Sequence, residues 1–272
     1  MKRSSSTTPA ASRGDKKIAR GPSKPHRHAV RADRGVMLIT AGPTHEPIDS
    51  VRFIGNRSSG RLGIELAQAA AKKGWRVRLL LGPVCTPLGT PPTPLTPPTT
   101  SKGDSRLSVA RFRTTADLQG LLEAEFPTCD VLVMAAAVAD YRPKIDADAL
   151  KKAGGKLKRD AAGLTITMEA TPDLLAGLKG LKRADQTTIG FALEPAERLE
   201  ESAKDKLVRK GLDAIVANEL RTMEASSIKA SVFVRDGRRI DTDGDVSKAK
   251  FAPWLLKVID EVRGDEGARK RK

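Results

Sequence analysis

The chain has 272 residues, enough for one large domain or two small ones, and its 39% hydrophobic and 30% charged residues are typical of a globular protein. Only two cysteines occur, Cys85 and Cys129, which excludes a disulfide framework and a cysteine-rich metal site and favours a reducing compartment. The longest apolar run, residues 131–139, has nine residues, whereas a membrane-spanning helix needs about 20. We therefore expect a cytoplasmic protein that makes no contact with a membrane.

The formal net charge of +16 is concentrated at the two ends of the chain. Residues 1–35 contain ten lysines and arginines and two aspartates, a net charge of +8, and residues 264–272 add +2. We expect residues 1–35 to form a disordered basic tail, because they offer almost nothing to bury, and residues 264–272 to form a basic C-terminal tail. A solubilising tail is the simplest role, and a nucleic-acid tether or an organelle transit peptide are the alternatives.

From residue 36 the chain alternates strand, loop and helix, which predicts a parallel sheet covered by helices. We predict strands over residues 36–40, 75–81, 107–113, 131–136, 164–168, 187–192 and 214–217, and a hairpin over residues 232–240. Helices are predicted over residues 58–73, 115–126 and 196–210, from Thr171 as N-cap with Pro172 in the first turn, and from residue 247 onward. Residues 86–106 form a proline-rich loop.

These elements predict an α/β fold with a doubly wound, mostly parallel, Rossmann-like sheet. Helices cover both faces of this sheet, and a small irregular β extension is added. The domain spans residues 36–263. In such a sheet, ligands bind at the carboxyl ends of the strands. Residues 41–63, 135–143 and 190–194 all follow or end predicted strands, so we expect these three segments to meet.

The first of these segments offers a phosphate site. Ser58, Ser59 and Gly60 open a predicted helix, so its free amides, two hydroxyls and the positive helix end can hold an anion. Plain helix capping is the alternative role for these serines. Neither a Walker loop nor the Gly-x-Gly-x-x-Gly dinucleotide fingerprint is present.

The second segment places small residues where a flat base can approach the backbone, and Asp140 is expected to face the cleft. A loop-capping carboxylate is the alternative for Asp140. Tyr141 and Lys144 are one residue too close for the Tyr-x-x-x-Lys pair of short-chain dehydrogenases. A nicotinamide-dependent oxidoreductase therefore remains only a third hypothesis.

Basic residues supply two further candidates. Lys156 and its neighbours Lys158 and Arg159 lie between glycines and can sit on a flap that closes on an anion. Lys206 and Lys210 are four residues apart on one predicted helix, hence on one face, and can bind a polyphosphate. The helix dipole favours cations at that position in any case.

Taken in this order, the segments resemble the phosphopantothenoylcysteine synthetase family, the phosphopantothenate–cysteine ligases of coenzyme A biosynthesis. The matching motifs fall between residues 39 and 218. They are AGPTHEPID (41–49), VRFI (51–54), NRSSGRLG (56–63), AAVADYRP (136–143), KLKR (156–159), PDLL (172–175), GFA (190–192) and KLVRKGLDAIVAN (206–218).

The resemblance implies a reaction, its co-substrate and its partners. The enzyme would activate the carboxylate of 4'-phosphopantothenate with CTP, or less favourably ATP, release pyrophosphate, and join the acyl nucleotide to L-cysteine, with Mg²⁺ on the phosphates. The resemblance also implies a homodimer, with residues 232–240 as a contact. Many bacterial relatives carry a flavin-dependent decarboxylase domain first, for which residues 1–35 are too short, so we expect that decarboxylase on another chain.

The resemblance further implies site residues. Asn56 matches the asparagine associated with the acyl-nucleotide intermediate, and Lys156 matches the flap lysine that reaches the nucleotide. Phe191 would pack near the base. The implied nucleotide-binding positions are Gly42, Ser58, Ser59, Gly60, Met134, Ala135, Ala136, Asp140, Thr171, Pro172, Asp173, Leu174, Phe191, Lys206 and Lys210. The metal ligands stay unknown at this point.

Overall fold

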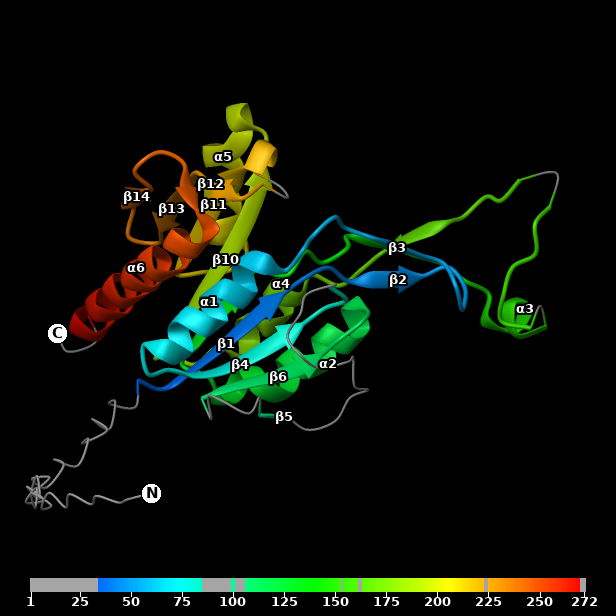
Figure 1. Cartoon of the computed structure of the whole chain (residues 1–272), viewed down its shortest axis with the longest axis horizontal. Helices are drawn as coiled ribbons and strands as arrows, with labels where there is room; N and C mark the ends of the chain where they lie inside the picture. Colours follow the sequence, from blue (N-terminus) through cyan, green and yellow to red (C-terminus); the bar gives the residue numbers. More distant parts are fainter. Residues whose placement is uncertain are drawn as a thin grey trace, which may run out of the picture. The chain divides into compact units, whose positions relative to one another are not determined.

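Strand β1 (Val36–Ala41) is buried along its whole length. Met37 and Ile39 belong to one hydrophobic cluster and Leu38 to a second one, so both faces of the strand are covered. A strand covered on both faces needs a continuous apolar run, which residues 36–39 supply. The computed structural model describes residues 34–84, 99–100, 106–152, 154–160, 163–222 and 225–269, and within them β1 is an inner strand of a nine-stranded sheet (Figure 1).

The sheet has the order β14-β13-β11-β10-β7-β1-β4-β6-β5. Six neighbouring strands run parallel: β6 (Leu107–Arg111), β4 (Arg76–Leu81), β1, β7 (Val131–Met134), β10 (Thr187–Glu194) and β11 (Ala214–Glu219). Strands β13 (Ala230–Val234), β14 (Arg239–Asp241) and β5 (Thr99–Thr100) add antiparallel edges. The chain moves outward from β1 in one direction and then from β7 in the other, so a topological switch point lies between these two strands.

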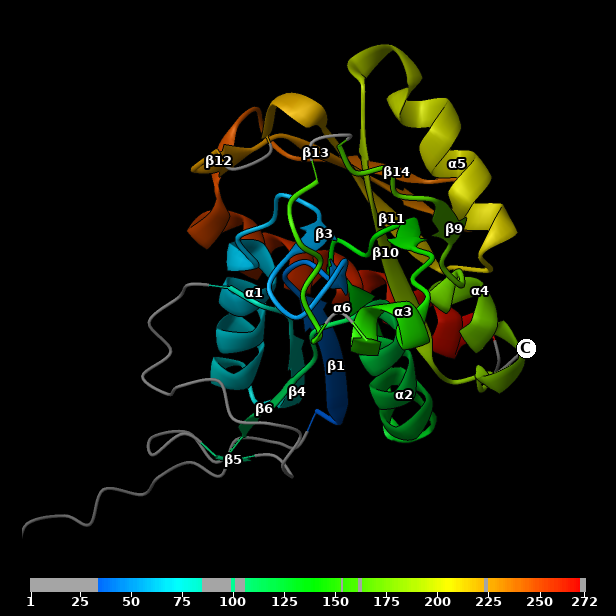
Figure 2. The same cartoon turned by 90° about the vertical axis from the view of Figure 1, so that its right-hand side faces the viewer.

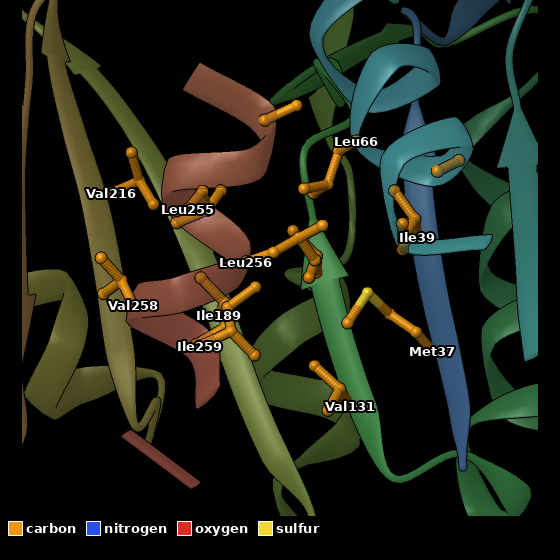
Figure 3. Close-up of a cluster of buried hydrophobic side chains, with 14 of the residues drawn as sticks. Met37, Ile39, Leu66, Val131, Ile189, Val216, Leu255, Leu256, Val258 and Ile259 are labelled. Atoms are coloured by element: carbon orange, nitrogen blue, oxygen red, sulfur yellow. The ribbon is translucent and has the colours of Figure 1, made fainter. Parts of the chain in front are cut away.

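Helices cover both faces of the sheet, as predicted, and each face has its own core. Helices α1 (Arg61–Lys72) and α6 (Lys248–Arg269) contribute to one hydrophobic cluster. Figure 3 shows Leu255, Leu256 and Ile259 of α6 packed over the strands of that face. Helices α2 (Thr115–Glu125), α4 (Leu174–Leu178) and α5 (Leu199–Arg209) contribute to the second cluster, on the opposite face (Figure 2).

An extension lies beyond the carboxyl end of β1 (Figure 1). It contains the antiparallel pairs β2 (His45–Pro47) with β3 (Phe53–Gly55) and β8 (Tyr141–Pro143) with β9 (Met168–Ala170), and the short helix α3 (Ala147–Lys152). This matches the predicted irregular β extension. A third small pair joins β12 (Ser227–Ile228) to β15 (Val246–Ser247).

Several element boundaries differ from the predictions. The strand predicted over residues 164–168 is wrong, because only from Met168 onward does the segment find a pairing partner, in β8. Thr99 and Thr100, predicted to lie in the proline-rich loop, form β5 instead, and most of that loop lies outside the described residues. Helix α6 continues to Arg269, past the predicted domain boundary.

The domain also begins earlier than predicted. Arg34, which the charge distribution placed in the basic tail, forms an ion pair with Asp260 and lies over the ring of Trp75. The tail before residue 34 lies outside the described residues. Within the described part of the chain, no helix combines the length and the apolar character that crossing a membrane requires.

Candidate active site

A cavity of about 720 Å³ opens at the switch point between β1 and β7. Residues 55–63, 134–140, 171–175 and 191–193 line it, together with Lys206, Lys210, Asn218, Thr222, Ile228 and Lys248. The expectation that the three strand-end segments meet is confirmed, because each of them contributes to this lining. The wall that follows β1 carries Asn56, Ser58, Ser59 and Gly60, and the wall that follows β7 carries Ala135, Ala136 and Asp140.

The wall after β1 is the start of helix α1. The prediction that this helix begins at Ser58 is wrong: it begins at Arg61, and Gly60 is the N-cap, with φ +67°. The Ser58 and Ser59 hydroxyls instead accept long bonds, of 3.4 Å, from the Gly60 and Arg61 amides. Both serines still line the cavity beside the first turn of α1, where backbone N–H groups lack helical partners.

Close packing brings this helix end to the sheet. A Cβ atom at Gly63 would lie 2.5 Å from the Ala41 Cβ, so α1 sits directly on the end of β1. Gly42, a predicted nucleotide-binding position, does not line the cavity. Its amide lies behind Gly60, 3.2 Å from where a Cβ atom at Gly60 would be. Gly42 therefore supports the wall and does not form its surface.

The wall after β7 is a loop, residues 135–140, that is fastened at several points. The Thr40 hydroxyl accepts a hydrogen bond from the Ala136 amide at 3.0 Å, and the Thr44 hydroxyl accepts one from the Ala139 amide at 3.0 Å. The Thr171 hydroxyl, from the turn before α4, donates to the Ala139 carbonyl at 2.5 Å. The backbone of this loop is therefore held in one position on the cavity wall.

Asn56 also contacts this loop. Its side-chain amide donates to the carbonyls of Ala137, at 3.3 Å, and Val138, at 3.0 Å. The side-chain nitrogen is thus directed at the loop across the cavity. The structure brings Asn56 and the loop together, and it shows the side chain bridging two cavity walls.

The turn before α4 differs from its prediction. Thr171 is not the N-cap of that helix: Asp173 is, and its carboxylate accepts from the Ala176 amide. Pro172 therefore precedes the cap. The Thr171 side chain is used by the loop after β7 instead, and Thr171, Pro172, Asp173 and Leu174 all line the cavity.

The two predicted polyphosphate lysines reach the cavity, and each is paired with a carboxylate. Lys206 lies 2.5 Å from Glu194, and Lys210, at the C-cap of α5, lies 3.2 Å from Asp173. Burial alone would raise the pKa of Asp173 and Glu194, but their hydrogen bonds and the lysines beside them lower the pKa of both overall. An anionic ligand would have to compete with these carboxylates for the lysines.

Lys156 does not line the cavity. Its segment, residues 154–160, is attached to the turn between β2 and β3: the Leu157 amide donates to Asp49 at 3.1 Å, and the Arg52 guanidinium donates to the Leu157 carbonyl at 2.7 Å. The hydrogen bond from the Arg52 side chain holds the pKa of Asp49 well below its usual range. This effect is larger than that of burial, which acts in the opposite direction. In this conformation the predicted flap lysine is separated from the other site residues.

Several lining residues were missed by the sequence reasoning. Arg57 and Arg61 stand inside the quoted NRSSGRLG motif, and Asn218 ends the last quoted motif, so a signal for these three existed. Lys248, at the start of α6, is only 8% exposed and belongs to none of the quoted motifs. With Lys206 and Lys210, the lining holds five cationic side chains and two carboxylates, Asp140 and Asp173, which favours an anionic ligand.

No group of three or more histidine, cysteine, aspartate or glutamate side chains that could hold a metal ion occurs within the described ranges. Phe191, on β10, is partly buried against the core and also lines the cavity. The site thus combines an aromatic surface, a helix N-terminus and cations around one space, which suits a nucleotide.

Comparison with known proteins places the chain in a family. Residues 33–262 match the family described as the DNA/pantothenate metabolism flavoprotein C-terminal domain. The chain belongs to this family. The resemblance drawn from the motifs is thereby confirmed at the level of the family, and the matched range contains every residue of the cavity lining.

Curated relatives of this family are longer proteins. The coenzyme A biosynthesis bifunctional protein CoaBC of Escherichia coli K12 is 38% identical over 211 residues, 75% of this chain and 47% of the relative. Its counterpart in Bacillus subtilis 168 is 34% identical over 240 residues, 86% of this chain and 53% of the relative. A protein named cysteine/cysteine sulfinic acid decarboxylase, from an unknown prokaryotic organism, is 40% identical over 185 residues, 68% of this chain and 46% of the relative. The chain spans about half the length of these relatives.

Solved structures agree with the fold. The crystal structure of the C-terminal domain of CoaBC is 30% identical, with a TM-score of 0.66, over 87% of this chain and 100% of that one. A Cab2 variant in complex with phosphopantothenate-cysteine has the same fold, with a TM-score of 0.66 and 18% identity over 88% of this chain and 89% of that one. The doubly wound fold predicted from the sequence is therefore confirmed both by the strand order and by these neighbours.

Proposed function

We propose that the protein is a phosphopantothenate–cysteine ligase of coenzyme A biosynthesis that acts in the cytoplasm. The observation that carries this proposal is the cavity at the switch point, where the start of α1, the loop after β7 and Phe191 surround one space with an excess of cationic side chains. Membership of the family and the similarity to CoaBC proteins support the same assignment.

The proposed reaction has two steps because a carboxylate is a poor electrophile. First, a carboxylate oxygen of 4'-phosphopantothenate attacks the α-phosphorus of the nucleotide, and pyrophosphate leaves. The amine of L-cysteine then attacks the acyl carbon, loses a proton, and displaces the nucleoside monophosphate, so that an amide bond forms. Both steps develop negative charge on oxygen, which the amides at the start of α1 and the nearby Arg57 and Arg61 would stabilise.

Asn56 has a clear role in this scheme. Its side-chain nitrogen lies 3.3 Å from the carbonyl oxygen of Ala137 and 3.0 Å from that of Val138. An acyl oxygen entering between Asn56 and the loop could replace a carbonyl as the acceptor, so Asn56 would both hold the loop and donate to the reacting group.

Mg²⁺ fits this site only as a companion of the nucleotide phosphates. Such an ion takes one or two carboxylates and obtains its remaining ligands from phosphate oxygens and water. Asp140 would hold it, because this lining carboxylate makes no hydrogen bond or ion pair to any described residue, whereas Asp173 is paired with Lys210. When bound, the ion would neutralise charge that develops on the phosphates.

CTP is the proposed nucleotide, with ATP as the alternative. The decisive experiment measures pyrophosphate release with each triphosphate, with and without phosphopantothenate and L-cysteine. We expect release that requires CTP and phosphopantothenate, followed by product formation that also requires cysteine. Release that is independent of phosphopantothenate would contradict the proposed ligase.

A nucleic-acid-binding module is the second candidate, favoured by the net charge of +8 in residues 1–35. Deleting residues 1–33, which keeps Arg34 and its ion pair with Asp260, separates the two candidates. Ligase turnover that survives the deletion supports the enzyme, whereas binding of nucleic acid that disappears with the tail supports the module. An absorbance change on adding a nicotinamide cofactor and candidate substrates would instead favour the oxidoreductase hypothesis.

We also propose a homodimer, with its contact on the extension and not on the hairpin of β13 and β14. Every residue of β13 is buried within its own chain, so that hairpin has little apolar surface to offer. Large exposed apolar side chains gather on the extension and its turns instead: Val51 is 60% exposed, Phe53 45% and Tyr141 60%. An exposed apolar patch of this kind marks an interaction surface.

A further inference from the structure

A buried chain of polar side chains lies behind the cavity wall that follows β7. Its members are Thr44, Glu46 and Thr115, which are 0%, 3% and 1% exposed. None of the three lines the cavity. The chain nevertheless ends on the amide of Ala139, whose residue does line it.

The hydrogen positions in this chain follow from counting protons. The Thr115 hydroxyl has one hydrogen and lies 2.7 Å from a carboxylate oxygen of Glu46, which can only accept, so Thr115 donates there. The hydroxyl oxygens of Thr44 and Thr115 are 3.4 Å apart, a long contact. Since the single Thr115 hydrogen is directed at Glu46, we assign the hydrogen between the two hydroxyls to Thr44. Thr44 in turn accepts from the Ala139 amide at 3.0 Å.

The result is a one-way chain: the Ala139 N–H donates to Thr44, Thr44 donates to Thr115, and Thr115 donates to Glu46. Each hydroxyl is at once an acceptor and a donor, and such chains polarise their members. The end of the chain is fixed, because the same Glu46 oxygen also accepts from the Thr115 amide at 2.8 Å, in the first turn of α2. A carboxylate at a helix N-terminus is favoured by the helix dipole.

We propose that Thr44, Thr115 and Glu46 form a positioning relay that fixes the backbone of residues 137–140 for the ligase reaction. This inference rests on the proposed function for its kinetic consequence only. The relay ties the loop to the start of α2, on the opposite face of the sheet from α1. Asn56 and Thr171 hold the same loop through its carbonyls, whereas Thr44 holds it through the Ala139 amide.

The test compares Thr44→Val, which has nearly the same shape but cannot accept the Ala139 hydrogen bond, with Thr44→Ser, which can. Hydrogen exchange of the Ala139 amide in the full chain is the first readout. We expect exchange about tenfold faster or more in Thr44→Val, normalised to an amide of β7, and wild-type exchange in Thr44→Ser. Wild-type protection of Ala139 in Thr44→Val would overturn the relay.

A matched control is Thr242→Val. Thr242 is also buried, at 7% exposure, and its hydroxyl also accepts a backbone amide, that of Ala230 at 3.1 Å, but it is not part of the cavity. This variant loses the same chemical group elsewhere in the fold, so it should leave the Ala139 amide protected. Faster exchange of Ala139 in Thr242→Val would show a global effect and overturn the assignment to the relay.

Turnover is the second readout. A loop displaced by a fraction of an ångström misaligns bound substrate, so we expect kcat of Thr44→Val to fall about tenfold or more, with a smaller change in KM and rescue by Thr44→Ser. Unchanged kcat together with faster exchange would overturn the kinetic role. If the wild-type chain shows no ligase turnover, the proposed function fails, and the exchange comparison still decides whether the relay exists.

A second variant covers the case in which Thr44→Val does not fold. Thr115→Val leaves the bond between Thr44 and Ala139 in place but removes the acceptor for the Thr44 hydrogen. We expect a smaller acceleration of Ala139 exchange, about threefold. In Glu46→Gln the amide oxygen can still accept from Thr115, so exchange close to wild type is expected. Wild-type exchange in Thr115→Val would end the relay at Thr44 and overturn its extension to Glu46.

Discussion

At the scale of single residues, Asn56 shows the difference between a motif and a contact. The motif gives the residue type and its place before a helix. It does not give the two carbonyls that the side chain reaches, which belong to residues more than 80 positions away in the sequence. Asn56 therefore has a structural task beside the chemical one that the resemblance implies.

The variant Asn56→Asp tests both tasks. A carboxylate cannot donate, and it would face the carbonyl oxygens of Ala137 and Val138. We expect a folded protein in which kcat for product formation falls by about 10² to 10³, the cost of losing one donor to a developing oxyanion. A coupled assay for product and a thermal melt make the comparison. Unchanged turnover in a folded Asn56→Asp protein would contradict the role of this side chain.

Of the two cysteines, Cys129 is the one within the described residues. Burial raises the pKa of its thiol to about 12. Only the thiolate reacts with alkylating reagents, so at pH 8 about one thiol in 10⁴ is reactive, by the difference between pH and pKa. We expect iodoacetamide to leave Cys129 unmodified in the native protein and to modify it in urea, as read by peptide mass spectrometry. Rapid labelling without denaturant would show that this part of the core opens.

At the scale of elements, helix α1 illustrates how a small residue sets a site. The amphipathic pattern places Leu62, Leu66, Ala69 and Ala70 on one face. Leu66 and Ala70 are buried, and Leu62 and Ala69 are partly buried against the same core. The pattern does not predict that Gly60 adopts the left-handed conformation and starts the helix three residues later than expected, since that depends on the approach of α1 to the loop at Gly42. The serines consequently lie before the helix and not within it.

Gly63→Ala tests this close approach. The new Cβ atom would lie 2.5 Å from the Ala41 Cβ and 3.2 Å from the Thr40 carbonyl, so helix and strand must separate. We expect the free energy of unfolding to fall by about 1–3 kcal/mol, the usual cost of overpacking.

A helical glycine with open space supplies the control for that measurement. Nothing lies within 4 Å of a Cβ atom at Gly120, in α2. Gly120→Ala should therefore raise the free energy of unfolding by about 0.5–1 kcal/mol, through helix propensity. Urea titration of both variants makes the comparison, and equal effects of the same sign would refute the packing argument.

At the scale of the whole molecule, the extension carries apolar side chains whose exposure a single chain does not explain. Apolar side chains at Val51, Phe53 and Tyr141 stay exposed, outside the two hydrophobic clusters that cover the faces of the sheet. The dimer contact predicted from the sequence is the hairpin over residues 232–240. We propose the extension instead, because β13 is buried within its own chain, whereas the extension exposes large apolar side chains.

Phe53→Glu tests the proposed dimer. A charge within the contact must be desolvated, so we expect the variant to elute with the mass of one chain, 29.2 kDa, where the wild type shows twice that mass by light scattering. Val208→Glu is the matched control, since Val208 is 78% exposed on α5 and lies outside the extension. A wild-type monomer, or a Phe53→Glu dimer, would refute the proposed contact.

The sequence by itself determined the order of the six parallel strands along the chain, the doubly wound class and the segments that meet at the switch point, because these depend on local periodicity and on general rules of chain connection. It could not decide how far each helix approaches the sheet, which acceptors the hydroxyls of Thr44 and Thr171 find, or where Lys156 rests. Those outcomes depend on contacts between residues far apart in the chain, and only the packed tertiary structure brings such partners within hydrogen-bonding distance.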